Sequence, residues 1–461
     1  MLGARRPERS GGNPEKRQWR DAGRPVNRRD FIKRAAASSA AASFLSARAV
    51  AAQKTLRILK WAHFVPTFDP WFESGARDWG REHDTRVLIE KVPVESIGNA
   101  ARSEVRAGRG HDICIFPWPP AEYYQHAIDH SEIYQRVAER YGAIPQLAHR
   151  STFNPHNRRY FGFADFWMPS PLHFFQDYWA QVGMPLGPVH YGALRAGGRK
   201  LRAQLGIPSG LAFTATLEGN VTLHTILYAH RAWLLNGDGS VLFNKNVFAF
   251  EALKYLQVLY EESGTPEQLT WGPSGNVHAM LARKTSSTTN AISLLRAAER
   301  QEPLVASKIR LQPPPIGTAG MGITALPHVT NCSVVWNFAR NPDGASQFLV
   351  DLMDHSRRGY EMSAGCNFPI YPKTVPDLVV RLSKDATADP TYKYVELKDA
   401  LHWTPNLGVP GFATPAYMEI FNSSLVPRMV QSVLRGEREP ADAAAIAATE
   451  MQRIADKWQR A

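Results

Sequence analysis

Trp118 is the residue of this chain whose surroundings best suit binding chemistry. It lies between Pro117 and Pro119, which fix the backbone and exclude a helix, so its ring is hard to bury on a regular face. An indole placed in this way offers a flat apolar surface on which a ligand can stack. We therefore predict that Trp118 contacts a ligand, and we interpret nearby Glu122 as a charge at the start of a helix.

A second aromatic group follows the stretch 55–61, whose alternating pattern predicts a strand. Trp61, His63 and Phe64 end this strand and begin the next loop. These three side chains either contact a ligand or pack beneath the helix that follows. Asp69, at the start of that helix, is better placed to cap it than to bind a ligand.

A third group lies in the aromatic stretch 160–169, which we predict to be a strand that crosses into a second lobe. Asp165 and Trp167 lie there among Phe163 and Phe166. A carboxylate surrounded by aromatic rings needs a partner, either an arginine or the hydroxyl groups of a ligand. We therefore include Asp165 and Trp167 among the candidate ligand contacts.

Motifs that would indicate catalysis are missing. The sequence contains no G-x-S-x-G, C-x-x-C or H-E-x-x-H pattern, and the carboxylates near its aromatic residues are scattered singly. Hydrolysis would require a nucleophile, an acid pair or a metal cluster. We therefore expect a protein that is not an enzyme, with no catalytic residue, no metal and no cofactor.

The elements that must position these side chains begin with a repeating pattern. Apolar periodicity predicts strands at 55–61, 85–92 and 111–116, with helices at 71–81 and 96–106 between them. This β-α-β-α-β order implies a parallel sheet, with ligands at the carboxyl ends of its strands. The aromatic loops described above follow the first and third strands.

The remaining chain is long enough for a second domain. We predict a strand at 171–176 and an amphipathic helix at 221–235, and we expect 362–372 to be irregular. Long helices are predicted over 416–435 and 440–459.

The N-terminal segment 1–52 resembles a twin-arginine export signal. Arg28, Arg29 and Phe31 precede an apolar run too short to span a bilayer, and small residues around Ala51 resemble a cleavage site. The resemblance implies export by the twin-arginine (Tat) machinery to the periplasm. Segment 1–52 contributes +8 of the net charge of +12, so the remainder carries only +4 and has no basic block for nucleic acid.

The chain has three cysteines, an odd number that argues against a disulfide framework. Cys114 lies in the apolar stretch 113–116 and is expected to be a buried small side chain. A bridge between Cys332 and Cys366 has no support beyond the oxidising compartment that export implies.

Four further segments resemble the sugar-binding family of extracellular solute-binding proteins of ABC importers. The segments 110–113, 279–284, 341–349 and 433–443 are similar to motifs of that family in the same order. One departure is 187–194, which lacks the Trp and the acidic residue usual at that place.

The resemblance implies a two-lobed, type II-like periplasmic-binding-protein fold of the α/β class. Each lobe would be a mostly parallel sheet flanked by helices, with the ligand cleft between the lobes. The first lobe would comprise 54–165 and 308–355, and the second 166–307 and 356–461.

Function follows from the same resemblance. The ligand would be a mono- or oligosaccharide, delivered by a monomer to the transmembrane subunits of the permease. Asn290, Asn367 and Trp403 lie in loops where the family tends to place ligand contacts, so the resemblance adds them to the candidate contacts. A polyol or another small polar solute, and a periplasmic sensor receptor, remain as alternatives.

Overall fold

The computed structural model describes residues 54–317 and 324–460. The expected export signal, with Arg28, Arg29, Phe31 and the cleavage site near Ala51, lies outside these ranges. Residues 54–461 form one unit of the chain. Within the described ranges, no helix has the length and apolar character needed to cross a membrane.

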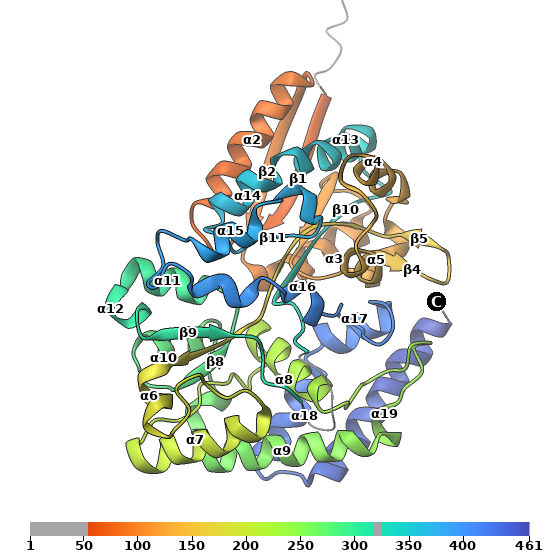
Figure 1. Ribbon diagram of the computed structural model, residues 1–461. Helices are drawn as coiled ribbons and strands as arrows, with labels where there is room; N and C mark the ends of the chain where they lie inside the picture. The colour runs from red at the N-terminus through yellow and green to blue at the C-terminus, as the bar shows by residue number, and fades with distance from the viewer. Residues whose placement is uncertain (1–53, 318–323, 461) are drawn as a thin grey trace, which may run out of the picture. The chain divides into compact units, whose positions relative to one another are not determined.

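A six-stranded sheet with the order β11-β6-β10-β3-β1-β2 forms the centre of the first lobe (Figure 1). Strand β1 is parallel to β2 and β3, whereas β10 is antiparallel to β3 and β6, and β11 is antiparallel to β6. The sheet is therefore mixed rather than mostly parallel, because β10 and β11 enter it after the chain has returned from the second lobe. Its strands are β1 Lys54–Trp61, β2 Thr85–Val92, β3 Ile113–Phe116, β6 Phe163–Met168, β10 Val329–Val335 and β11 Phe368–Pro369.

The predicted β-α-β-α-β start is confirmed. Helix α2 (Phe68–Glu82) connects β1 to β2, and α3 (Ile97–Ala107) connects β2 to β3. Helix α3 ends at Gly108, whose left-handed φ of 58° suits glycine. The lobe also contains α4 Ser131–Tyr141, α5 Gln146–Thr152, β4 Phe153–Asn154, β5 Arg159–Tyr160, α13 Pro342–Leu352, α14 Ser356–Met362 and α15 Leu378–Ser383.

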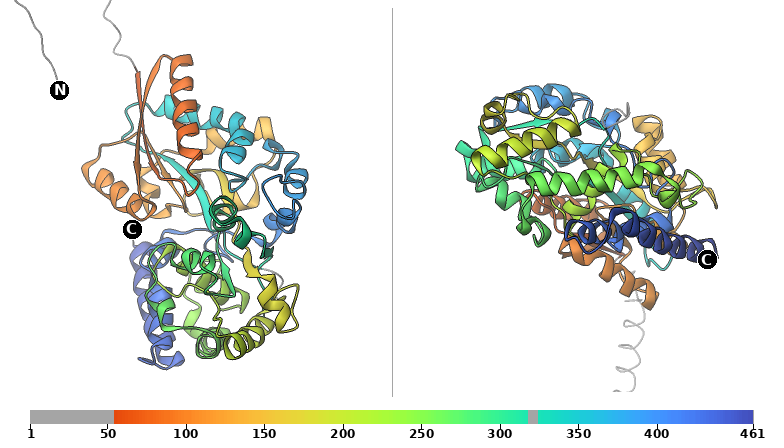
Figure 2. Two further views of the ribbon diagram at one scale, coloured as in Figure 1. Left: turned by 90° about the vertical axis from the view of Figure 1, so that its left-hand side faces the viewer. Right: turned by 90° about the horizontal axis from the view of Figure 1, so that it is seen from below.

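A three-stranded antiparallel sheet, with the order β8-β7-β9, belongs to the second lobe (Figures 1 and 2). Strand β7 confirms the strand predicted at 171–176. The sheet and its neighbouring helices are β7 Leu172–Phe175, β8 Ser287–Thr289, β9 Ile309–Gln312, α6 Gln176–Gln181, α10 Gly275–Leu281, α11 Ser293–Gln301 and α12 Pro303–Ala306.

Helices dominate the second core, where α8 contacts α9 and α18. Helix α8 lies earlier than the predicted 221–235, and every residue from Gly219 to Ala229 is buried, so it is not amphipathic. The predicted helix 416–435 is two helices, because Ser424 has a left-handed φ of 54°. The helices are α7 Tyr191–Leu205, α8 Leu217–Ala229, α9 Val247–Ser263, α17 Pro415–Asn422, α18 Leu425–Leu434 and α19 Pro440–Gln459. Helix α16 (Ala400–Trp403) instead packs into the first core.

The strands do not follow the expected lobe boundaries at two places. Strand β9 was expected in the first lobe but pairs with β7 in the smaller sheet. Strand β11, within the segment expected to be irregular and to belong to the second lobe, pairs with β6 in the larger sheet. The chain therefore crosses between lobes later than predicted in both cases.

The three cysteines are buried and free, so Cys332 and Cys366 are not bridged in this structure. Cys114 confirms the expectation of a small side chain in the core, with no exposed surface. Within the described residues, no group of three His, Cys, Asp or Glu side chains is placed to hold a metal ion.

Candidate functional site

A pocket of about 300 Å³ lies between the two lobes, and Trp118 forms part of its wall. Glu122 from the first lobe, and Asn220, Phe421 and Asn422 from the second, also line it. The Trp118 ring is half-buried and packs against the hydrophobic cores of both lobes. Its centroid is 6.5 Å from that of Phe421. We call this space the inter-lobe pocket.

Local structure holds Trp118 in place. It lies two residues after the end of β3, and the preceding Pro117 carbonyl accepts a hydrogen bond at 3.0 Å from the backbone N–H of Thr330, which belongs to β10. The chain bends at Pro117 and Trp118, and the flanking prolines exclude a helix there, so the indole lies beyond the end of the strand. This supports the sequence-based reasoning that the ring does not lie on a regular buried face.

Two hydrogen-bond acceptors in the wall of the inter-lobe pocket have no partner among residues 54–317 and 324–460. Asn422 Nδ2 donates to Glu122 Oε1 at 2.7 Å, which leaves the buried Oε2 without a hydrogen bond. Asn220 Nδ2 donates to the Phe421 carbonyl at 2.7 Å, which leaves the buried Asn220 Oδ1 without one. Buried polar atoms are nearly always paired. Two residues of the pocket wall therefore each contain a buried acceptor that no described residue satisfies.

Burial also changes the acidity of the pocket. Loss of solvent raises the pKa of Glu122 to about 7, although the hydrogen bond from Asn422 and the charge of Arg102 act in the opposite direction. The neighbouring charge of Glu419 raises the pKa further. The carboxyl group is therefore close to half ionised at neutral pH.

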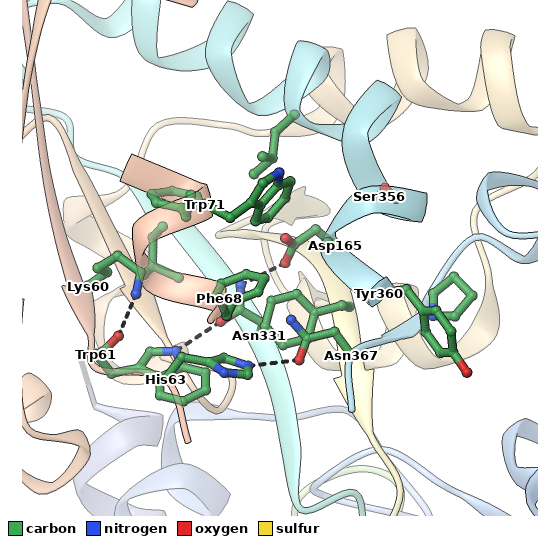
Figure 3. Close-up of a pocket in the computed structure, with 16 residues that line it drawn as sticks. Lys60, Trp61, His63, Phe68, Trp71, Asp165, Asn331, Ser356, Tyr360 and Asn367 are labelled. Carbon is green, nitrogen blue, oxygen red and sulfur yellow. Dashed lines mark hydrogen bonds between the residues drawn. The ribbon is translucent and has the colours of Figure 1, made fainter. Parts of the chain in front are cut away.

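Four of the predicted contact residues line a second, smaller cavity beneath α2 and α14 (Figure 3). These are Trp61, His63, Asp165 and Asn367. The space, which we call the α2–α14 pocket, measures about 40 Å³ and belongs entirely to the first lobe. Aromatic rings supply much of its remaining wall, namely those of Phe68, Trp71, Phe72, Phe166 and Tyr360.

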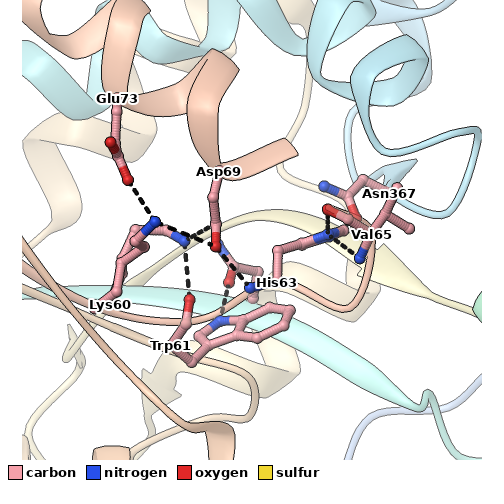
Figure 4. Close-up of polar contacts among 9 residues, drawn as sticks. Lys60, Trp61, His63, Val65, Asp69, Glu73 and Asn367 are labelled. Carbon is pink, nitrogen blue, oxygen red and sulfur yellow. Dashed lines mark hydrogen bonds and ion pairs between the residues drawn. The ribbon is translucent and has the colours of Figure 1, made fainter. Parts of the chain in front are cut away.

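A short chain of hydrogen bonds orients Asn367 (Figure 4). The Val65 backbone N–H donates to His63 Nδ1 at 3.0 Å, so Nε2 of this neutral ring carries the proton. Nε2 then donates to Asn367 Oδ1 at 2.9 Å. Burial lowers the pKa of His63 to about 4, which keeps the ring neutral. The buried Asn367 Nδ2 has no hydrogen-bond partner in the part of the chain that the structure describes.

Asp69 does not cap α2 as expected, because it forms a buried ion pair with Lys60 (Figure 4). The Lys60 ammonium also donates to the Trp61 carbonyl at 2.8 Å, and the His63 backbone N–H donates to Asp69 Oδ2 at 3.2 Å. Thr67 is the residue at the N-cap position. The Asp69 carboxylate thus neutralises a buried cation instead of capping the N-terminus of α2.

Asp165 has an amide partner, and among the described residues the arginine considered as a partner is not found. Asn331 Nδ2 donates to Asp165 Oδ1 at 2.8 Å, and Asn331 Oδ1 accepts from Trp61 Nε1 at 2.9 Å. Burial raises the pKa of Asp165 to about 6. No basic side chain of the described ranges forms an ion pair with it, so its charge is uncompensated.

Two other predicted contacts lie close to these pockets without lining either. Phe64 is half-buried, with its ring centroid 5.2 Å from Trp61 and 5.9 Å from His328. Trp167 is buried in the first core, 5.6 Å from the Phe368 ring. The Trp167 ring is part of the first hydrophobic core, and this packing against the face of the sheet buries it.

The last two predicted contacts are elsewhere. Asn290 is buried, where its Oδ1 accepts from the Ala291 backbone at 2.7 Å and its Nδ2 donates to Asn276 at 3.3 Å. Trp403 is nearly buried and lines a separate pocket of about 580 Å³ together with Trp233. The nine predicted residues are therefore distributed over several places and do not form one site.

Sequence reasoning missed Asn220 and Asn422, and it gave Glu122 a structural role only. Asn220 lies in the first half of a buried helix, and Asn422 at the end of another. A buried polar residue in an apolar helix was the available signal for Asn220. Nothing in the sequence brings residue 422 close to residue 122.

Comparison with known proteins supports the fold. No family model matches the sequence, and no curated protein matches it. Solved structures do match: a solute-binding protein of an ABC transporter from Thermotoga lettingae, bound with α-D-tagatose, has a TM-score of 0.70 at 16% identity, with 87% of this chain and 100% of that chain covered.

Two further structures agree. Maltose-bound MalE3 from T. maritima has a TM-score of 0.71 at 17% identity, covering 87% of this chain and 99% of that one. A sugar transporter from Arthrobacter chlorophenolicus with bound laminaribiose has a TM-score of 0.73 at 11% identity, with the same coverage. The chain therefore has the two-lobed α/β fold of periplasmic sugar-binding proteins.

Proposed function

We propose that this chain is the substrate-binding protein of an ABC importer and captures a carbohydrate in the inter-lobe pocket. The observation that carries the proposal is the pairing of an aromatic wall, Trp118, with two unpaired acceptors, Glu122 Oε2 and Asn220 Oδ1. A sugar offers both complements, because its C–H face is apolar and its hydroxyl groups donate hydrogen bonds.

Size supports the same ligand class. A volume of about 300 Å³ lies at the lower end of the range of roughly 300–1,000 Å³ that small-molecule pockets occupy. This volume suits a monosaccharide or one unit of a longer oligosaccharide. The carbohydrate in this proposal is therefore mono- or oligomeric, and one ring at a time stacks on Trp118.

Binding would join the two lobes. Trp118 and Glu122 belong to the first lobe and Asn220 and Asn422 to the second, so a sugar that contacts all four favours the arrangement in which the lobes meet. A ligand shifts a conformational equilibrium by its differential affinity for the two states. The sugar is then released unchanged to the transmembrane subunits of the permease, and the protein performs no catalysis.

The cellular setting completes the proposal. Segment 1–52 would direct export through the Tat machinery, with cleavage near Ala51, and the protein would work as a monomer in the periplasm. A polyol is the second candidate ligand, because a solute-binding protein from Agrobacterium radiobacter with a TM-score of 0.67 and 15% identity holds ribitol. A polyol shares the hydroxyl donors of a sugar but lacks the rigid ring face.

The test is a melting-temperature screen of the purified protein against monosaccharides, oligosaccharides, polyols and amino acids. A micromolar ligand supplied at about 1 mM should stabilise the folded state by roughly 4 kcal/mol. Calorimetry then compares the wild type with Trp118→Ala, for which we expect at least tenfold weaker binding, about 1.4 kcal/mol. Trp271→Ala, a half-buried tryptophan outside the pocket, is the matched control.

The outcomes separate the alternatives. Stabilisation by sugars but not by linear polyols supports stacking on Trp118, whereas the reverse order favours the polyol. Equal affinity of Trp118→Ala and the wild type would remove Trp118 from the site. A shift with amino acids alone would contradict the carbohydrate proposal while leaving the fold unaffected.

A further inference from the structure

The α2–α14 pocket differs from the inter-lobe pocket in size, charge and wall. A volume of about 40 Å³ holds on the order of three water molecules, since one water needs roughly 10–15 Å³ of such space. Three or four non-hydrogen atoms fill it. A sugar ring is several times larger, so this cavity requires a different ligand.

The charges around this cavity leave one negative group uncompensated. Lys60 lines it, but its ammonium is paired with Asp69 and also donates to the Trp61 carbonyl. Asp165 has an amide hydrogen bond and no ion pair within residues 54–317 and 324–460. A buried carboxylate without a counter-charge is costly, and a cation in the cavity would relieve that cost.

The aromatic wall of the cavity also favours a positively charged ligand. The centroid of Phe68 is 5.3 Å from that of Trp71 and 5.9 Å from that of Phe166, and all three rings border the cavity with Asp165. Figure 3 shows Phe68, Trp71 and Asp165. The faces of such rings attract organic cations, most strongly when water is excluded. Because Trp71 is half-buried, the wall it forms also reaches the surface.

A second polar group, the side-chain amide of Asn367, requires the ligand to carry a hydrogen-bond acceptor as well. Asn367 is 3% exposed, its Oδ1 accepts from His63, and its Nδ2 has no partner although Asn367 lines the cavity. A ligand that satisfies both groups carries an ammonium for Asp165 and an oxygen for Asn367. With room for about four heavy atoms, the chemical class is a small amino alcohol.

We propose that the α2–α14 pocket binds a small amino alcohol of the size of ethanolamine, with its ammonium at Asp165 and its oxygen at Asn367. This site is separate from the carbohydrate site, and it does not rest on the proposed function. Sugar binding can be absent while the amine binds, and the reverse also holds.

Three probes of similar size test the two contacts. Ethanolamine hydrochloride carries both groups, n-propylammonium chloride lacks the oxygen, and ethylene glycol lacks the charge. We expect calorimetry at pH 8 to give the tightest binding for ethanolamine and at least fivefold weaker binding for n-propylammonium. Ethylene glycol should not bind measurably. Equal binding of ethylene glycol and ethanolamine would overturn the proposal.

Variants test the residues. Asp165→Asn keeps the acceptor for Asn331 but loses the charge, so we expect at least tenfold weaker ethanolamine binding. Asp78→Asn, an exposed carboxylate on α2, is the control for the lost charge. Trp71→Leu alters the half-exposed wall and should weaken binding at least fivefold, which keeps the proposal testable if Asp165→Asn does not fold. Unchanged affinity in both pocket variants would refute the site.

The pH dependence gives an independent check. Ethanolamine affinity should decrease about tenfold per pH unit below the Asp165 pKa of about 6, because the protonated carboxyl no longer attracts the cation. Around Asp165, burial keeps His63 neutral with a pKa of about 4 and raises the pKa of Tyr360 to about 12. Burial also raises the pKa of the Cys332 thiol well above its usual value. Affinity that is constant from pH 8 to pH 5 would contradict the ion pair.

Discussion

Glu122→Gln should make the stability of the protein less dependent on pH. Burial raises the pKa of Glu122 from 4.5 to about 7 in the folded state. Between these values the folded protein keeps the proton that the unfolded chain has released, so the free energy of unfolding decreases as the pH rises. Each unit of pKa difference corresponds to 1.36 kcal/mol, so the free energy of unfolding is lower by about 3 kcal/mol once the pH is above 7.

Glutamine preserves the acceptor for Asn422 but cannot ionise, so the variant should not suffer this loss. For the folded unit of residues 54–461 the entropy of unfolding is roughly 0.9 kcal/mol/K, and about 3 kcal/mol corresponds to a shift of roughly 3–4 °C. We therefore compare how far the melting temperature falls between pH 4.5 and pH 8 in the two proteins. The fall should be roughly 3–4 °C larger in the wild type than in Glu122→Gln. Comparing the two pH values removes any pH-independent effect of the substitution.

The assay is thermal unfolding followed by tryptophan fluorescence at several pH values, without ligand. Glu437→Gln, an exposed glutamate, serves as the control and should follow the wild type. Parallel curves for Glu122→Gln and the wild type would refute the reasoning. The same variant should bind sugar at least tenfold more weakly at pH 8, because the unpaired carboxylate acceptor is replaced by an amide donor.

Three further substitutions test other parts of the structure. Asp69→Ala should destabilise the protein by about 3–5 kcal/mol, because it leaves Lys60 buried without its partner, and urea unfolding measures this. A double variant that also replaces Lys60 by Met should recover much of the loss. Trp167→Phe should lower stability by about 1 kcal/mol with no change in sugar affinity by calorimetry, since the ring lies in the core. Gly365→Ala should destabilise by about 1–2 kcal/mol in the same unfolding assay, because this glycine has a φ of +76° and its added methyl group would lie 3.1 Å from Arg296.

Local sequence patterns predicted the first part of the fold well. The strand at 85–92 has the predicted limits, and the helix ending near Gly108 ends there because glycine adopts the left-handed conformation without strain. Such signals depend on neighbouring residues only. They could not predict the antiparallel entry of β10 and β11, because strand direction depends on how the chain returns from the second lobe.

The site was harder to predict for the same reason. The aromatic character of Trp118 and its flanking prolines are visible in the sequence. By contrast, Asn422, the hydrogen-bond partner of Glu122, lies 300 residues further along the chain and reaches the pocket only through packing of α17. Asp69 was assigned to a cap because a carboxylate in the first turn of a helix often has that role. The buried lysine that it neutralises lies on the preceding strand.

The strand order of the larger sheet has a consequence for how the protein is made. Its central strand β10 begins at residue 329 and its edge strand β11 ends at residue 369, so the sheet cannot be complete until about four fifths of the chain has left the ribosome. Contacts between such distant segments form slowly, and until they form, β3 lacks its neighbour β10 and β6 lacks both β10 and β11. The nascent first lobe is therefore the stage at which this protein most needs protection by chaperones.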